Sequence, residues 1–199
     1  MKWATVCVSC VFAFFPNEPA NADETVISSV LENGGFEYPN VREPMDEGTV
    51  PSVWFHFSSP PDAGRVGLTT RCARNGRQSL FFKAQEDTDA YQTILQKIPV
   101  DAGGSYEFSV YVLNSAQDPI VGEAFGQISL EWKNAHDVEC DRTWGSTWTA
   151  GLSTNLWQRF LVSGTVPYEA VSCLPAITFF SRDIRNHGIF FVDDAAFVC

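Results

Sequence analysis

The stretch Leu31-Glu32-Asn33-Gly34-Gly35-Phe36-Glu37, near the start of the chain, carries the strongest local signal for the fold. Its two glycines let the backbone take positive φ values or approach another segment closely. On an extended chain Phe36 faces a core while its neighbour Glu37 points the other way. A carboxylate beside exposed backbone carbonyls is half of an oxygen cage for a hard cation such as calcium. The alternative is a Gly-Gly bulge followed by a surface Glu.

The other half of such a cage stands at the far end of the chain, in Phe191-Val192-Asp193-Asp194-Ala195-Ala196-Phe197. An ion between Glu37 and Asp193 would tie the first strand to the last. Asp193 falls in a hydrophobic strand, where a carboxylate is costly unless something pairs with it. Backbone N–H groups are the alternative partners for this carboxylate.

The first 22 residues have the pattern of a secretory signal. An apolar run over 3–15 follows Lys2, and Ala20-Asn21-Ala22 has the small-x-small form of a cleavage site. The run is shorter than the roughly 20 apolar residues that a membrane helix needs. We therefore expect cleavage near Ala22, a single mature domain over 23–199, and secretion to the extracellular space or the periplasm.

Charge and cysteine content narrow the class of protein further. The net charge of −11 opposes binding to nucleic acid and to anionic membranes, and it is compatible with neutral ligands and divalent cations. We expect a monomer. Four cysteines follow the signal, and an even number in an exported chain predicts two disulfides with three possible pairings: Cys72, Cys140, Cys173 and Cys199.

Hydrophobic residues alternate with the period of β-strands. The alternation is clear over 106–112, 128–132 and 160–162, and further strands are predicted over 79–83, 176–180 and 188–197. No segment shows a sustained helical stripe. Sixteen Phe and six Trp suggest two packed sheets with aromatic inner faces. The sequence thus predicts an all-β fold, a two-sheet antiparallel β-sandwich of the jelly-roll type.

Several motifs follow one another along the chain in this order: 33–37, Trp54, 75–80 (Asn-Gly-Arg-Gln-Ser-Leu), 96–109, Trp157 with 162–167, and Val192-Asp193-Asp194. Together they resemble the jelly-roll carbohydrate-binding modules of families 4, 9, 16 and 22, which have a galactose-binding-like fold. The resemblance covers essentially the whole mature chain. The same fold also serves as protein-binding and adhesive domains, so the ligand has to be argued from the site.

The resemblance implies a structural calcium ion. At the matching positions Glu37 and Asp193 are the side-chain ligands, and the backbone near Gly35 and at Gln78, in the 75–79 turn, completes the shell. The implied strand order also predicts the disulfides. It brings the loops of Cys140 and Cys173 together within one sheet, and it places the segment of Cys72 beside the last strand, which ends at Cys199. We expect the bridges Cys140–Cys173 and Cys72–Cys199.

The resemblance further implies a poly- or oligosaccharide ligand on one face of the sandwich. By strand phase Tyr111, Gln127 and Glu131 point out of the core, and we expect them to line one concave face with Tyr91. This mix of stacking and hydrogen-bonding groups is what a glycan cleft needs.

The tryptophans divide into two groups. Trp54, Trp132 and Trp157 are expected in the core. Trp144 and Trp148 lie in a polar Gly/Ser/Thr context, and a spacing of four would put them on the same side of a strand. They are candidates for the ligand surface, with coverage of a sheet edge as the alternative.

Catalysis is the less favoured interpretation. A glycosidase needs two carboxylates across a cleft, and Glu131 has no evident partner on its own strand. A lyase using Tyr111 with His136 is a conceivable alternative. Two main hypotheses result: a secreted, non-catalytic, calcium-stabilised glycan-binding module, or an extracellular protein-binding or adhesive domain. Exposed aromatic residues with polar neighbours would favour the sugar.

Overall fold

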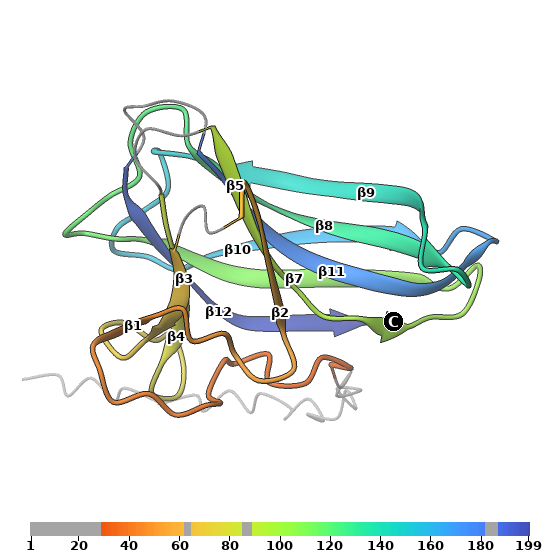
Figure 1. Ribbon diagram of the computed structural model, residues 1–199, viewed down its shortest axis with the longest axis horizontal. Helices are drawn as coiled ribbons and strands as arrows, with labels where there is room; N and C mark the ends of the chain where they lie inside the picture. The colour runs from red at the N-terminus through yellow and green to blue at the C-terminus, as the bar shows by residue number, and fades with distance from the viewer. Residues whose placement is uncertain (1–28, 62–64, 85–88, 182–186) are drawn as a thin grey trace, which may run out of the picture.

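The computed structural model describes residues 29–61, 65–84, 89–181 and 187–199. The expected signal over 1–22 lies outside these residues. In the part of the chain that the structure describes, no helix is long and apolar enough to cross a membrane. The described chain forms two antiparallel sheets that lie one over the other (Figure 1). The predicted all-β sandwich is therefore confirmed.

The first sheet has the strand order β1-β3-β4-β12-β7-β10. Its strands are β1 (Met45–Glu47), β3 (Arg65–Thr69), β4 (Ser79–Lys83), β12 (Ile189–Val198), β7 (Ser105–Asn114) and β10 (Gln158–Thr165). The second sheet has the order β2-β5-β11-β8-β9, and a short strand, β6 (Ile98–Pro99), pairs with β11. Its other strands are β2 (Phe55–Ser59), β5 (Ala90–Leu95), β11 (Ala170–Ser181), β8 (Phe125–Asn134) and β9 (Glu139–Trp148).

Aromatic rings from both sheets meet in the core, as the alternation predicts. Phe190 of β12 stacks on Phe82 of β4 with ring centroids 5.0 Å apart. Its edge meets Phe179 of β11, in the opposite sheet, at 4.8 Å. Trp54 and Trp132, expected in the core, are buried. Such interdigitation of the two inner faces fixes the spacing of the sheets and leaves their outer faces to carry function.

The segment that opens the described chain lies beside its last strand. The Val30 N–H donates to the Phe197 carbonyl at 2.9 Å, and the Ala195 N–H donates to the Gly34 carbonyl at 2.9 Å. A Cβ on Gly34 would meet the Ala195 oxygen at 2.2 Å, so the close approach requires glycine there. Phe36 is fully buried and Glu37 half-buried. The predicted contact between the two ends of the chain is therefore present.

Candidate functional site

The outer face of the second sheet carries a cleft of about 430 Å³. Strand register decides what lines it, because residues two apart on a strand share a face. Across the middle of the sheet Thr93 of β5 pairs with Thr178 of β11, and their hydroxyls lie 2.9 Å apart. Thr178 in turn pairs with Gln127 of β8. The two threonine side chains are short and leave room above the sheet, and larger side chains stand on both sides of them.

One wall of the cleft is aromatic. Tyr91 of β5 pairs with Phe180 of β11, which pairs with Phe125 of β8. Their ring centroids lie 6.0 Å and 4.6 Å apart in that order. Phe57 of the edge strand β2 adds a fourth ring, 5.9 Å from Tyr91. Phe57 is 54% exposed and Tyr91 36%, so the row offers ring surface to a ligand.

The opposite wall is charged and comes from the β8–β9 hairpin. Arg142 contacts Glu131 at 3.1 Å and Glu139 at 2.7 Å, and Lys133 contacts the same two carboxylates at 3.6 Å and 3.2 Å. We call these four residues the charged tetrad. The Arg142 guanidinium also lies 4.7 Å from the ring of Trp144, which is 51% exposed at the β9 edge. Two positive and two negative groups thus form a wall of balanced charge.

Burial and ion pairing act on the two carboxylates of the tetrad in opposite directions. Glu131 is buried, and loss of solvation raises the pKa of its carboxyl although Arg142 and Lys133 lower it. A hydrogen bond from Arg142 holds the pKa of Glu139 below its usual value.

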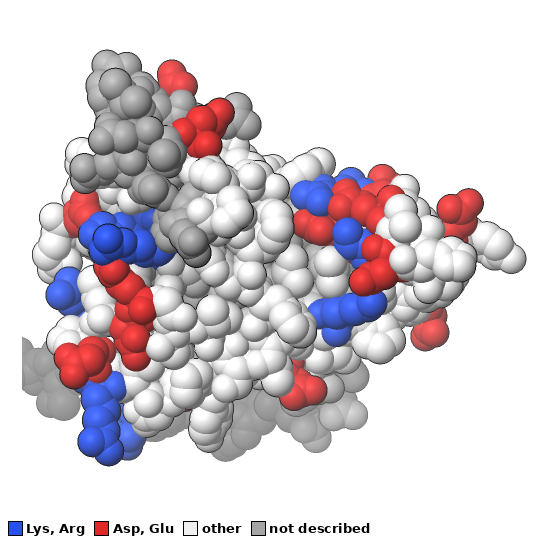
Figure 2. Space-filling view, viewed as in Figure 1, with Lys and Arg blue, Asp and Glu red and all other residues white. Residues whose placement is uncertain are grey.

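In Figure 2 side chains of both signs gather at the end of the molecule where the β8–β9 hairpin lies, and the surface beside them is largely uncharged.

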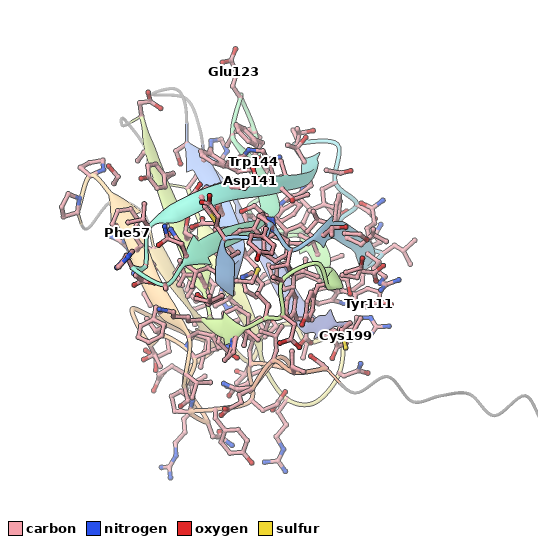
Figure 3. The ribbon with its side chains drawn as sticks, turned by 90° about the vertical axis from the view of Figure 1, so that its right-hand side faces the viewer. Phe57, Tyr111, Glu123, Asp141, Trp144 and Cys199 are labelled. Atoms are coloured by element: carbon pink, nitrogen blue, oxygen red, sulfur yellow. The ribbon has the colours of Figure 1, made fainter. Side chains whose placement is uncertain are left out.

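The predicted site residues fall on two different faces. Tyr91, Gln127, Glu131 and Trp144 lie on the outer face of the second sheet. Tyr111 points out of the core as predicted, but β7 belongs to the first sheet, so it does not share a face with the others. Figure 3 shows Phe57 and Tyr111 on opposite sides of the sandwich. The Arg74 guanidinium covers the Tyr111 ring at 3.6 Å.

The prediction that Trp148 lies on the ligand surface is also wrong. It is only 2% exposed and packs in the core against Phe160 and Phe190. A bulge in β9 is the reason: Gln127 pairs with Thr147 and Ser129 with Trp144, so the single residue Ile128 faces two on β9. The extra residue reverses the side on which the following side chains point. The spacing of four therefore puts Trp144 outside and Trp148 inside.

The sequence did not single out Phe57, Phe180, Lys133 or Arg142 as site residues. The Phe55-His56-Phe57 alternation was the available signal for Phe57, and it placed apolar side chains on one side of a short strand. Arg142 could not be found in this way, because its role depends on the ion pairs across β8 and β9. The conceivable lyase pair is not brought together, since Tyr111 lies in the first sheet and His136 in the β8–β9 turn of the second.

The residues expected to hold calcium converge on the turn at 74–78. Asp193 is fully buried, and its Oδ2 accepts the N–H groups of Arg74 at 2.7 Å and Asn75 at 3.2 Å. Its Oδ1 accepts the Asp194 N–H at 2.8 Å. Burial raises the pKa of Asp193 to about 6, although these three bonds lower it. Glu37 accepts the N–H groups of Arg77 at 3.0 Å and Gln78 at 3.4 Å through Oε1.

Gln78 completes this arrangement, which we call the N–H clamp (Glu37, the 74–78 turn and Asp193). Its side-chain amide donates to the carbonyls of Phe36 and Pro39 at 2.7 Å and 2.8 Å, and its oxygen accepts the Val41 N–H. The turn thus offers N–H donors to both carboxylates, where a calcium shell would need oxygen ligands. Among the described residues no three His, Cys, Asp or Glu side chains gather as a metal site. The geometry does not require an ion, and the calcium expectation stays a prediction.

Neither predicted disulfide is present. Cys72, Cys140, Cys173 and Cys199 are all free thiols. β8 separates Cys140 on β9 from Cys173 on β11, and two strand spacings of about 4.8 Å exceed the ~7 Å limit between bridged Cα atoms. Cys72 lies beside Phe191, near the start of β12, whereas Cys199 follows the end of that strand. The first pairing failed because strands of one sheet need not be neighbours, and the second failed because Cys72 and Cys199 lie at opposite ends of β12.

Comparison with known proteins shows which solved structures share this fold. No protein-family model and no curated protein matches the sequence. Among solved structures, the module TmCBM61 in complex with β-1,4-galactotriose has a TM-score of 0.51 at 16% identity, and the match covers 85% of this chain and 97% of that one. A cyclase from Fischerella sp. TAU, in complex with 4-(1H-indol-3-yl)butan-2-one, has a TM-score of 0.64 at 12% identity, covering 86% and 96%.

The enzymatically active domain of bacteriophage CBA120 tailspike protein 4 is also similar, with a TM-score of 0.63 at 13% identity. The match covers 85% of this chain but spans only 21% of the tailspike chain. Identities this low establish the fold and nothing finer. The chain therefore shares its β-sandwich fold with carbohydrate-binding modules such as TmCBM61 and with the cyclase.

Proposed function

We propose that the protein is a non-catalytic glycan-binding module whose ligand lies in the cleft of the second sheet. The observation that carries this proposal is the pair of facing walls, one of exposed rings and one of charged hydrogen-bonding groups. Sugar rings offer apolar C–H faces to aromatic side chains and hydroxyls to polar ones. Structural similarity to carbohydrate-binding modules supports it.

The state of the two carboxylates supports binding rather than hydrolysis. Glu131 and Glu139 both contact Arg142 and Lys133. A glycosidase needs one carboxylic acid and one carboxylate free to meet the scissile bond from two sides. In the charged tetrad the two cations occupy that space. The alternative of a protein-binding domain is less well supported, because the exposed rings are flanked by polar groups rather than by a flat apolar surface.

We also propose that the protein acts outside the cell, on the strength of its N-terminal signal pattern. N-terminal sequencing of the exported chain tests this, and a start near Asp23 is expected. A mature chain that begins within the first 15 residues would contradict it.

A glycan array followed by calorimetry tests the binding function. Trp144→Ala and Phe57→Ala should each weaken binding of the best array ligand by about 1–3 kcal/mol, because each removes an exposed platform. Tyr111→Ala is the matched control, since that ring lies on the opposite face, and its affinity should equal the wild type. A wild type that binds no glycan would overturn the proposal. Loss of affinity only in Tyr111→Ala would move the site to the first sheet.

The aromatic wall supports a second candidate, a small aromatic ligand, because the similar cyclase was solved with an indole compound. Titration of the wild type with 4-(1H-indol-3-yl)butan-2-one separates the two. If the compound binds the wild type but not Phe57→Ala, and the glycan array shows no binding, the second candidate is favoured.

A further inference from the structure

A second pocket, of about 600 Å³, adjoins the edge strand β2. Apolar side chains make up most of its lining: Val30, Val53, Phe55, Ile98, Pro99 and Tyr106. Glu32 and Lys97 bring one negative and one positive group to it. The proposed glycan cleft does not use this pocket.

Three of its apolar side chains are largely exposed to solvent. Val30 is 47% exposed, Val53 48% and Phe55 62%. Single exposed apolar residues are ordinary, but a contiguous group of them on a monomer marks an interaction surface. Phe57, also exposed, stands two residues from Phe55 on β2 and extends the group to the edge of the cleft.

Val53 is held in a conformation that a valine rarely adopts. Its φ is 68°, in the left-handed region that a β-branched side chain disfavours. Its neighbours fix it: Ser52 N–H donates to the Tyr38 carbonyl at 2.8 Å, and Trp54 N–H donates to the Pro51 carbonyl at 3.1 Å. Glycine would suit this backbone better. Strain of this kind concentrates at ligand sites, and here it aims an apolar side chain at the pocket.

The pocket adjoins the cleft along two strands. On β2, Phe57 lines the cleft and Phe55 lines the pocket. In and just past β5, Leu95 lines the cleft and Lys97 the pocket. A chain-like ligand that crosses the sheet from Trp144 on β9 to Phe57 on β2 spans four strand spacings, about 19 Å. Its next units would turn at β2 and run along that edge strand to Phe55, two residues from Phe57.

We propose that this pocket binds further units of the same glycan, so that the protein recognises a polysaccharide chain rather than a short sugar. The inference rests on the proposed function. Phe55 and Val53 pack against the apolar faces of the sugar rings, and the Glu32 carboxylate and the Lys97 ammonium group bond to their hydroxyls. Lys97 also contacts Asp137 at 2.7 Å in an exposed ion pair.

The test compares long and short ligands on matched variants. The probes are soluble β-1,4-galactan, xylan and β-glucan, each with its own trisaccharide, measured by calorimetry. Phe55→Ala should lower affinity for the polymer about five- to tenfold and leave the trisaccharide unchanged. Trp144→Ala should weaken both. Leu161→Ala, an exposed apolar residue on β10 in the other sheet, should change neither.

Val53→Gly separates ligand binding from stability. It removes a pocket side chain and relieves the left-handed strain, so polymer affinity should fall while the melting temperature holds or rises. Polymer affinity that is unchanged in both Phe55→Ala and Val53→Gly, with trisaccharide binding intact in the wild type, overturns this inference and leaves the proposed function standing. A wild type that binds none of these probes contradicts both.

Discussion

Glu131 and Glu139 lie in one ion-pair cluster but should respond to pH in opposite ways. Burial raises the pKa of Glu131 in the folded state, so its contribution to stability is full at low pH and is lost as pH rises through the raised pKa. The pKa of Glu139 is lowered, so its contribution is present at neutral pH and is lost as pH falls. The window for both effects surrounds the usual Glu value of about 4.3.

Glu131→Gln and Glu139→Gln are therefore a matched pair of variants. We expect the unfolding free energy of Glu131→Gln, relative to the wild type, to increase as pH rises through this window. That of Glu139→Gln should decrease, because only the wild type gains the ionised carboxylate held by Arg142. Urea unfolding at a series of pH values measures both. Slopes of the same sign would mean that burial does not dominate at Glu131.

At the scale of the strand, the faces of β7 and β8 were predictable from sequence, whereas those of β9 were not. Strand phase correctly predicted the inward faces of β7 and β8, where Phe108, Val110, Ile128 and Leu130 are buried. It could not predict the β9 bulge, because an unpaired residue appears only once the partner strand and its register are known. Phase also gives the side on which Tyr111 points but not the sheet to which β7 belongs. Topology decides that, and topology separated Tyr111 from the cleft.

The 74–78 turn is the element on which the N–H clamp depends, and Gly76 is its critical position. Gly76 has φ +68°, and a Cβ there would meet the Glu37 Oε1 at 2.0 Å. Gly103 has a similar φ, +77°, with nothing within 4 Å of its Cβ position. Gly103→Ala should cost about 1 kcal/mol for left-handed backbone alone. Gly76→Ala should cost about 3 kcal/mol, because the Glu37 carboxylate also loses its N–H donors.

Urea unfolding of the two glycine variants gives the comparison directly. An equal loss in both would show that the carboxylate moves aside without cost and that the turn does not hold it.

Across the whole molecule, the contact between the two ends of the chain was predictable from sequence, because Gly34-Gly35 permits a close backbone approach and the Asp193 carboxylate needs a partner. Residues 32–35 nevertheless form a turn beside the last strand, not the expected first strand. The groups that hold the ends together were not predictable, since both backbone N–H donors and a calcium ion can compensate a buried carboxylate. The structure shows backbone N–H donors on Glu37 and Asp193. The resemblance to calcium-bearing modules predicts an ion there. The two explanations predict different effects of a calcium chelator on the melting temperature.

Melting of the wild type and of Glu37→Ala, each in excess calcium and in chelator, distinguishes them. Glu37→Ala should lower the melting temperature in chelator, because the N–H groups of Arg77 and Gln78 then lose their acceptor. A bound ion must stabilise the folded state by mass action, so calcium should raise the melting temperature of the wild type and widen its difference from the variant. Identical wild-type melting with and without calcium would contradict the ion, and the N–H clamp alone would then join the ends of the chain.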